Sequence, residues 1–187
     1  MAAKSNLSNM LLVLTGTCLI CSALLAGIYS VTAEPIAQTN KNILMESISA
    51  VVPDGVQISD AKPLSVGGKD SEYYECSKDG SVVAYAIKSE ATGFGGALTL
   101  MVGITTDGIV YNASVLSHSE TPGLGANCTT DEHFKAQWKG FDPSSKILAV
   151  KKDGGDVDAI TASTITSRAY ALAVKNAVEA YKNIKGE

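Results

Sequence analysis

The sequence predicts an α+β protein: an N-terminal transmembrane helix, followed by one domain in which helices flank a mostly antiparallel sheet. Three observations lead to this prediction. Residues 5–33 carry no charge, β-rich segments between residues 72 and 116 are joined by short glycine turns, and the last segment has the apolar spacing of a helix. We expect residues 1–33 to form a cytoplasmic N-terminus and membrane anchor, and residues 34–187 to form one extracytoplasmic domain.

The anchor prediction rests on residues 10–33, a run of 24 uncharged and mainly apolar residues. A helix rises about 1.5 Å per residue, so this run reaches roughly 36 Å and exceeds a hydrocarbon core of about 30 Å. A cleaved signal peptide with small residues at 31–33 is the alternative, although its apolar region would be unusually long. Lys4 precedes the run and Glu34 follows it, which favours a cytoplasmic N-terminus in the plasma (inner) membrane and a domain on the periplasmic or extracellular side.

The domain is acidic, because it contains all 19 Asp and Glu residues and all but one of the 15 Lys and Arg residues. Without a basic block to attract phosphate backbones, nucleic acid is not an expected partner. Cys18 and Cys21 lie in the apolar run, where we expect them to serve as small apolar side chains. A metal or cluster role would need ligands from another chain. Cys76 and Cys128 belong to the domain, and whether they form a disulfide stays open. No metal site is expected.

Two hairpins and a further strand are expected in the domain. The first hairpin joins Glu72–Cys76 to Ser81–Lys88 through a Lys-Asp-Gly turn. The second joins Ala97–Thr105 to Ile109–Leu116 through Thr-Asp-Gly, in which the Asp-Gly pair suits the positive φ angles of a tight turn. Ser145–Val150 has the composition of one more strand.

Three helices are expected beside the sheet. An amphipathic helix opens at Glu34-Pro35 and ends at Pro53-Asp54-Gly55. A short helix is capped by Thr129 or Thr130. The last helix is the clearest, because its apolar residues recur at spacings of three and four: Tyr170, Val174, Ala177, Tyr181 and Ile184.

Hydroxyl side chains are concentrated where this last helix begins, in the stretch D-A-I-T-A-S-T-I-T-S from Asp158 to Ser167. The unpaired amides and the dipole at a helix N-terminus favour a bound anion such as phosphate. Capping is the alternative, with Thr164, Thr166 or Ser167 as the N-cap residue. Capping accounts for one hydroxyl and leaves the others unexplained.

The segment D-A-I-T-A-S-T, Asp158–Thr164, resembles the flavinylation motif Asp-x-x-(Ser/Thr)-Gly-Ala-(Thr/Ser), whose final hydroxyl is joined to the phosphate of FMN. This layout is found in the G subunit of the Rnf ion-translocating electron-transport complex and in the longer C subunit of the sodium-translocating NADH:quinone reductase. The resemblance implies that Thr164 carries covalent FMN as a phosphoester, made by a separate flavin transferase that recognises Asp158. Ala162 and Ser163 replace the usual Gly and Ala, so a rival hydroxyl lies next to the acceptor.

Two further segments resemble the same family: S-H-S-E-T-P-G-L-G at residues 117–125 and G-F-G-G at residues 93–96. In the first, Pro122 stiffens the loop, the glycines allow backbone amides to approach a ring, and the leucine offers an apolar contact. An ordinary surface turn is the alternative. Besides Thr164, the residues expected to bind FMN are Thr161, Ser163, Thr166, Glu120, Thr121, Gly123, Leu124 and Gly125.

The resemblance implies an electron relay in an Rnf-type complex, which oxidises ferredoxin, reduces NAD and moves sodium ions or protons. The expected partners are the other subunits of that complex, the flavin transferase and the membrane. A flavin-binding sensory or regulatory module and an extracytoplasmic reductase subunit are the rival interpretations. No catalytic residue is expected, because a carrier needs only a well-held cofactor. His118 has either a structural hydrogen bond or a role in proton transfer, and His133 is expected on a solvated helix face.

Overall fold

The computed structural model describes residues 7–186 and contains two compact units, one up to Ile43 and one from Leu44 onward. Helix α1 (Leu7–Val51) supplies the first unit and the first residues of the second. The side chains of its apolar part are exposed, and its mean hydropathy reaches 2.3 over 18 residues, so by length and composition it can cross a membrane. The domain boundary predicted after residue 33 stays a prediction, and Lys4 lies outside the described residues.

The amphipathic helix expected to begin at Glu34-Pro35 is not a separate element, because α1 continues through Pro35. A proline inside a helix removes one backbone hydrogen bond, which weakens a helix without necessarily ending it. Of the apolar residues in this part of α1, Ile48 and Val51 are fully buried, whereas Ile36 is 56% exposed. The predicted end at Pro53-Asp54-Gly55 is confirmed, since α1 stops at Val51.

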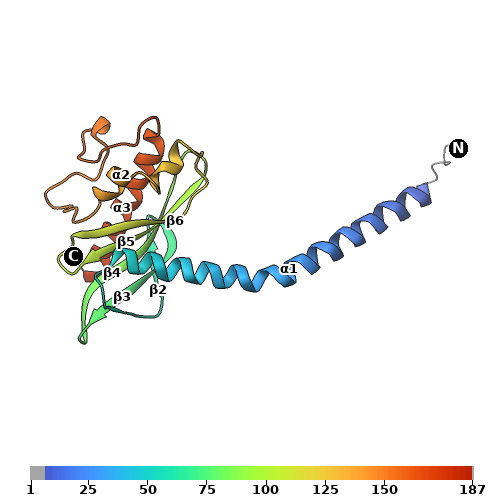
Figure 1. Ribbon diagram of the computed structural model, residues 1–187, viewed down its shortest axis with the longest axis horizontal. Helices are drawn as coiled ribbons and strands as arrows, with labels where there is room; N and C mark the ends of the chain where they lie inside the picture. The colour runs from blue at the N-terminus through green and yellow to red at the C-terminus, as the bar shows by residue number, and fades with distance from the viewer. Residues whose placement is uncertain (1–6, 187) are drawn as a thin grey trace. The chain divides into compact units, whose positions relative to one another are not determined.

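The second unit contains a six-stranded antiparallel sheet in the order β1-β3-β4-β5-β6, with β2 also paired to β3 (Figure 1). The strands are β1 (Gln57–Ile58), β2 (Lys62–Val66), β3 (Lys69–Lys78), β4 (Ser81–Thr92), β5 (Ala97–Thr105) and β6 (Val110–Ser117). The remaining elements are the 3₁₀ turns η1 (Gly125–Cys128) and η2 (Lys151–Asp153), helix α2 (Glu132–Ala136) and helix α3 (Thr164–Lys185). The predicted α+β fold is therefore confirmed.

Both predicted hairpins are present, with different turns. Asp79 and Gly80 have φ angles of 53° and 81°, as a two-residue hairpin turn requires. In the second turn only Gly108 has positive φ, 81°, and its amide donates to the carbonyl of Thr105 at 3.0 Å. The expectation of two positive φ angles in the Asp-Gly turn is wrong, because this longer loop needs just one left-handed residue.

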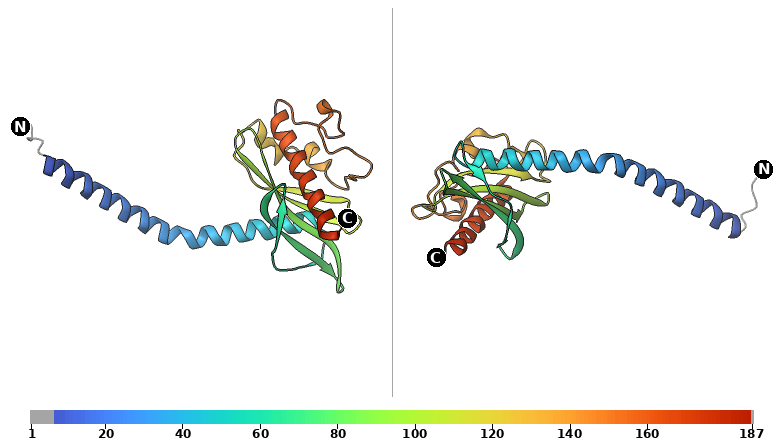
Figure 2. Two further views of the ribbon diagram at one scale, coloured as in Figure 1. Left: turned by 180° about the vertical axis from the view of Figure 1, so that it is seen from behind. Right: turned by 90° about the horizontal axis from the view of Figure 1, so that it is seen from below.

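The two faces of the sheet bury different cores. Helix α3 covers one face (Figures 1 and 2), where Ile87, Leu100 and Val102 belong to the larger apolar cluster. On the opposite face, Ala86 and Met101 pack with Ile48 and Val51 from the end of α1. Alternate residues of a strand point to opposite faces, which is why neighbours in β4 and β5 join different clusters.

Gly103 of β5 explains how closely α1 approaches the sheet. A Cβ atom at this position would collide with the carbonyl of Val51, so the sheet accepts the helix end only where the strand has glycine.

Two expectations for the second unit are wrong. Ser145–Val150 is not a strand; it forms turns, and only Val150 makes an isolated bridge, to Val157. Asp131, not Thr129 or Thr130, caps α2, since its carboxylate accepts from the Phe134 amide at 3.1 Å. In both places a nearby side chain or backbone contact outweighs the local preference.

Cys76 and Cys128 are both free thiols and lie in different core clusters. Burial raises the pKa of each thiol to about 11, so both are protonated and poorly reactive at neutral pH. Cys18 and Cys21 are exposed on α1 and are also free.

Candidate functional site

The hydroxyl-rich stretch places its four predicted side chains in four different environments. Thr161 is exposed, and Thr164 is half-buried on the wall of a cavity. Ser163 is buried, and its Oγ has no hydrogen-bond partner among the described residues. Thr166 is buried and donates its hydroxyl proton to Glu120 Oε2 at 2.9 Å. Ser163, Thr164 and Thr166 all line this cavity, and Thr164 is the one of the three that is not buried.

Helix α3 begins without a side-chain cap. Ser163 occupies the N-cap position but makes no capping hydrogen bond, and the first turn contains no acidic residue. Capping as the explanation of the hydroxyl cluster is therefore wrong. The exposed amides and the positive end of the helix dipole lie beside Thr164, where they favour a phosphate group.

Ala162 adopts a left-handed backbone with φ of 59° just before this helix. The flavinylation motif has Gly at this position, and a side chain in the left-handed region costs about 1 kcal/mol. The chain thus keeps the turn of the motif in spite of the Ala side chain. The turn directs the backbone from the exposed Thr161 to the buried Ser163.

The cavity beside Thr164 has a volume of about 310 Å³. Three apolar side chains on its wall are unusually open to solvent: Phe94 is 70% exposed, Ile165 50% and Leu124 45%. Its lining residues are Phe94, Glu120, Thr121, Leu124, Gly125, Ala162, Ser163, Thr164, Ile165 and Thr166. A flat apolar ring with a polar edge fits such a wall, which combines apolar side chains with a few polar groups.

Glu120 holds the two sides of the cavity together. It is 6% exposed, and its Oε1 accepts hydrogen bonds from the amides of Phe94 at 2.8 Å and Gly95 at 3.4 Å. Its Oε2 accepts from Thr166 at the start of α3. One buried carboxylate therefore joins the Gly93–Gly96 turn to the hydroxyl segment, and a contact with the cofactor stays a prediction.

The Pro-Gly loop is a tight turn packed against this carboxylate. The Thr121 carbonyl accepts from the amides of Leu124 and Ala126, both at 3.2 Å, and Gly123 has φ of 75°. A Cβ atom on Gly125 would lie 2.6 Å from Thr166 Oγ1 and would also collide with Glu120. Thr121, Leu124 and Gly125 line the cavity, whereas Gly123 is absent from its wall.

The two histidines have different surroundings, and a proton-transfer role for His118 stays a prediction. His118 Nδ1 accepts from the Glu120 amide at 3.2 Å, a structural bond that positions the carboxylate. His133 is exposed on α2, as expected. Among the described residues, no group of His, Cys, Asp and Glu side chains is arranged to hold a metal ion.

The turn η2 contacts the motif and α3 through three consecutive side chains. Lys151 pairs with Asp158 at 2.7 Å, and Lys152 Nζ donates to Thr164 Oγ1 at 3.4 Å. Asp153 receives two hydrogen bonds of 2.6 Å from Arg168, and this guanidinium lowers the pKa of the Asp153 carboxyl.

Sequence reasoning missed η2 as part of the site. Its members carry ordinary surface charges, and only the fold brings them next to the motif. The available signal in the sequence was that Lys-Lys-Asp at residues 151–153 is followed by polar or oppositely charged partners at Asp158, Thr164 and Arg168. This signal is weak.

Two further residues fix the backbone of the motif. Gln137 accepts from the Asp158 amide at 2.8 Å and donates to the Asp158 carbonyl at 3.2 Å. Ser167 is fully buried, accepts from the Ile160 amide at 2.9 Å and donates to the Ser163 carbonyl at 3.0 Å. These bonds explain why the hydroxyl stretch contains Ser167, which belongs to neither the cap nor the cavity wall.

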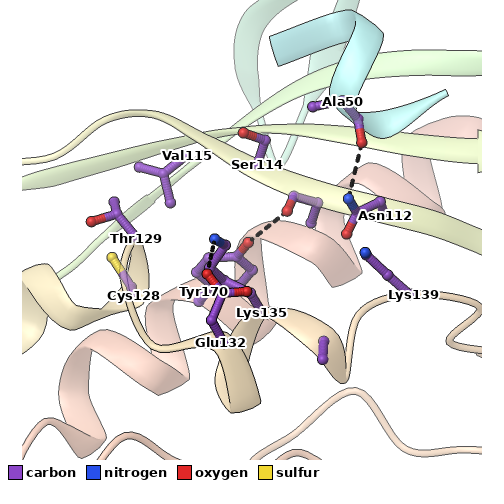
Figure 3. A pocket seen from close by; sticks show the side chains of 12 residues that line it. Ala50, Asn112, Ser114, Val115, Cys128, Thr129, Glu132, Lys135, Lys139 and Tyr170 are labelled. Atoms are coloured by element: carbon purple, nitrogen blue, oxygen red, sulfur yellow. Dashed lines mark hydrogen bonds and ion pairs between the residues drawn. The ribbon is translucent and has the colours of Figure 1, made fainter.

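A second cavity of about 500 Å³ lies between β6 and α2 (Figure 3). Tyr170 and Cys128 lie on its wall, and Tyr170 donates its hydroxyl proton to the carbonyl of Ala113 at 3.2 Å. None of the predicted site residues lines this cavity. The smaller cavity beside Thr164 is therefore the candidate site.

The residues of the smaller cavity fit FMN. An uncapped helix N-terminus suits the phosphate, the buried Ser163 hydroxyl has an unused donor, and the exposed apolar side chains suit the ring. When bound, FMN supplies one- and two-electron transfer.

Comparison with known proteins identifies the same segment. The profile of the FMN-binding domain family matches residues 93–179, which include the Gly93–Gly96 turn, the Pro-Gly loop and Thr164. The chain is 36% identical to the G subunit of the proton-translocating ferredoxin:NAD(+) oxidoreductase complex of Clostridium ljungdahlii, over 92% of this chain and 90% of that protein. It is also 36% identical to the G subunit of the ion-translocating oxidoreductase complex of Shewanella baltica, over 88% and 84% of the two chains.

Among solved structures, the crystal structure of Shewanella oneidensis NqrC is similar, with a TM-score of 0.49, 22% identity and coverage of 75% of this chain and 74% of that chain. The sequence relatives carry the assignment, since they extend over most of both chains. The chain therefore belongs to the family of G subunits of ion-translocating oxidoreductase complexes, with an FMN-binding domain that follows one apolar helix long enough to cross a membrane.

Proposed function

We propose that this chain carries FMN as a phosphoester on Thr164 and relays electrons within a membrane complex that couples ferredoxin:NAD oxidoreduction to sodium or proton movement. The observation that carries the proposal is the position of Thr164. Thr164 lines the cavity at the uncapped start of α3 and is only half-buried, while Ser163 Oγ is buried and Thr166 is bonded to Glu120.

Electron relay needs a cofactor that is firmly bound and that stays accessible to its electron-transfer partners. Phe94, Leu124 and Ile165 form an exposed apolar wall, so a ring seated there keeps one side accessible to a partner subunit. A covalent bond prevents loss of the cofactor from a domain that faces an open compartment. Asp158, half-exposed and paired with Lys151, is proposed as the residue that the flavin transferase recognises.

Mass measurement tests the attachment. The full chain is produced with its flavin transferase, and intact and peptide masses are compared for wild type, Thr164→Val, Thr161→Val and Ser163→Ala. We expect an FMN-sized increment in wild type, Thr161→Val and Ser163→Ala, and none in Thr164→Val. An increment that persists in Thr164→Val would move the attachment to another hydroxyl.

Purification tests the relay against its rivals. We expect the flavinylated chain to be isolated from native membranes with the other subunits of the complex. A flavinylated chain that is isolated alone and never turns over would favour a sensory module, and turnover with external acceptors alone would favour a reductase subunit.

The orientation of the domain is a separate part of the proposal. A periplasmic or extracellular domain makes residues after α1 accessible to an impermeant protease in spheroplasts, from which the outer layers of the envelope have been removed. Protection of the domain in spheroplasts, with cleavage after lysis, would reverse the orientation.

A further inference from the structure

We infer that Lys152 is a specificity-determining residue for FMN attachment, which selects Thr164 as the acceptor and neutralises the phosphoester formed there. This inference rests on the proposed attachment to Thr164. It concerns a residue outside the flavinylation motif, contributed by the turn η2.

The first step of the argument is the distribution of positive charge around the acceptor. Three cationic side chains lie near the start of α3, and two of them already pair with carboxylates. Lys151 pairs with Asp158, and Arg168 forms two hydrogen bonds with Asp153. Within residues 7–186, no carboxylate forms an ion pair with Lys152, and its ammonium donates to Thr164 Oγ1 at 3.4 Å. The charge of Lys152 also lowers the pKa of the adjacent Asp153 carboxyl, but of the three cations Lys152 is the one that forms a hydrogen bond with Thr164 Oγ1.

The second step is how η2 places this ammonium. Its neighbours Lys151 and Asp153 tie the turn to the motif and to α3, and the Gly154 backbone ends it with φ of 83°. The contacts on both sides hold the backbone of Lys152 beside Thr164, and from there its exposed side chain reaches Thr164 Oγ1. The buried Ser163 Oγ has no such contact, so the ammonium distinguishes two adjacent hydroxyls.

The third step is the chemistry of the attachment. An activated donor with a pyrophosphate bond is needed, and a flavin dinucleotide is the donor of this class. Thr164 Oγ1 forms a bond to the phosphorus on the riboflavin side, the pyrophosphate bond breaks, and adenosine monophosphate leaves with the electron pair. The hydroxyl proton passes to a base of the transferase.

Negative charge develops on Thr164 Oγ1 and on the phosphate oxygens during this step. An ammonium already bonded to Oγ1 stabilises that charge without reorganisation, and the nearby amides of α3 act in the same direction. After transfer, the product is an anionic diester, for which Lys152 stays as the counter-ion.

The test measures the rate at which the full chain gains FMN. Purified wild type, Lys152→Met, Lys152→Arg and Lys175→Met are incubated in detergent with the transferase and flavin adenine dinucleotide, and the modified fraction is followed by intact mass. Lys175→Met removes the same charge from an exposed position of α3 that pairs weakly with Glu179, at 3.9 Å. Circular dichroism checks that each variant is folded, as expected for exposed side chains.

We expect Lys152→Met to slow the modification at least tenfold, Lys152→Arg to keep it within threefold of wild type, and Lys175→Met to leave it unchanged. We also expect added salt to slow wild type and to have less effect on Lys152→Met, because screening acts on the charge that this variant lacks. Equal rates for Lys152→Met and Lys175→Met would overturn the role of Lys152. If wild type gains no FMN, or if Thr164→Val gains it, the proposed attachment itself is wrong.

Discussion

At its C-terminal end helix α3 satisfies its own backbone, whereas at its N-terminal end it does not. Gly186 adopts φ of 77°, and its amide donates to the carbonyls of Lys182 and Asn183, with basic residues in the last turn. The N-terminal end has a left-handed Ala162, an N-cap Ser163 without a capping bond and no acidic residue in its first turn. The difference shows that the start of α3 has no side-chain cap and is held by contacts with other elements instead.

The largest effect on stability is expected from removing Glu120, whose hydrogen bond with Thr166 helps to hold the uncapped start of α3. Glu120→Ala leaves the Phe94 amide and the buried Thr166 hydroxyl without their acceptor, which should lower the free energy of unfolding by about 3 kcal/mol, since bonds to charged groups contribute more than neutral ones. Urea unfolding of the full chain in detergent measures it. Glu120→Gln keeps one acceptor, so the free energy of unfolding should fall by about half as much. A change below about 0.5 kcal/mol in both variants would contradict the proposed stabilising role of Glu120.

Ala162→Gly should stabilise the folded protein at the N-terminal end of α3. Glycine adopts the left-handed backbone without the side-chain clash, so the free energy of unfolding should rise by about 1 kcal/mol. The same urea experiment checks this, with Ala159→Gly as a control outside the left-handed region. Equal losses in both variants would mean that Ala162 is not strained.

Gly186→Ala should weaken the C-terminal end by only a few tenths of a kcal/mol, because the cap lies at a helix end that frays easily. FMN attachment should not change. Hydrogen exchange of the last turn measures the effect, and slower exchange in the variant would contradict the capping role of Gly186.

The smallest effect is the pH dependence of the Asp153–Arg168 pair. Arg168 lowers the pKa of Asp153 below its ordinary 3.8, so the pair stabilises the folded state above pH 3.8 and loses this contribution as pH falls through the lower folded pKa. Arg168→Met should therefore flatten the loss of stability below about pH 4. Thermal unfolding between pH 7 and pH 3 checks this, with Lys175→Met, at another ion pair of α3, as the comparison. Parallel pH profiles for wild type and Arg168→Met would show that the Asp153–Arg168 pair does not contribute to the pH dependence of stability.

The comparison also shows why sequence patterns were reliable in some places and not in others. The apolar stripe of α3 and the Asp79-Gly80 turn are local signals, and both are present in the structure. Ser145–Val150 has strand composition, but only Val150 finds a bridge partner, Val157, and the rest of the segment forms turns. The cap of α2 moved to Asp131 because the best-placed oxygen, not the nearest hydroxyl, meets the Phe134 amide.

In the candidate site, too, some residues can be identified from local sequence patterns and others cannot. The three motifs are readable because the residues in each are consecutive, and their resemblance to a flavoprotein family is confirmed by relatives over most of the chain. Lys152 and Gln137 carry no such signal, since their contacts with Thr164 and Asp158 join residues 12 and 21 positions apart.

The sequence by itself determined the apolar helix, the hairpins, the last helix and the identity of the flavin motif, because each depends on neighbouring residues with a regular period or spacing. The tertiary structure alone decided which hydroxyl residues of the motif are buried, that Glu120 joins two distant segments and that η2 brings an ammonium to Thr164. Those facts depend on which side chains are desolvated and which find a partner across the fold, and no local pattern encodes either.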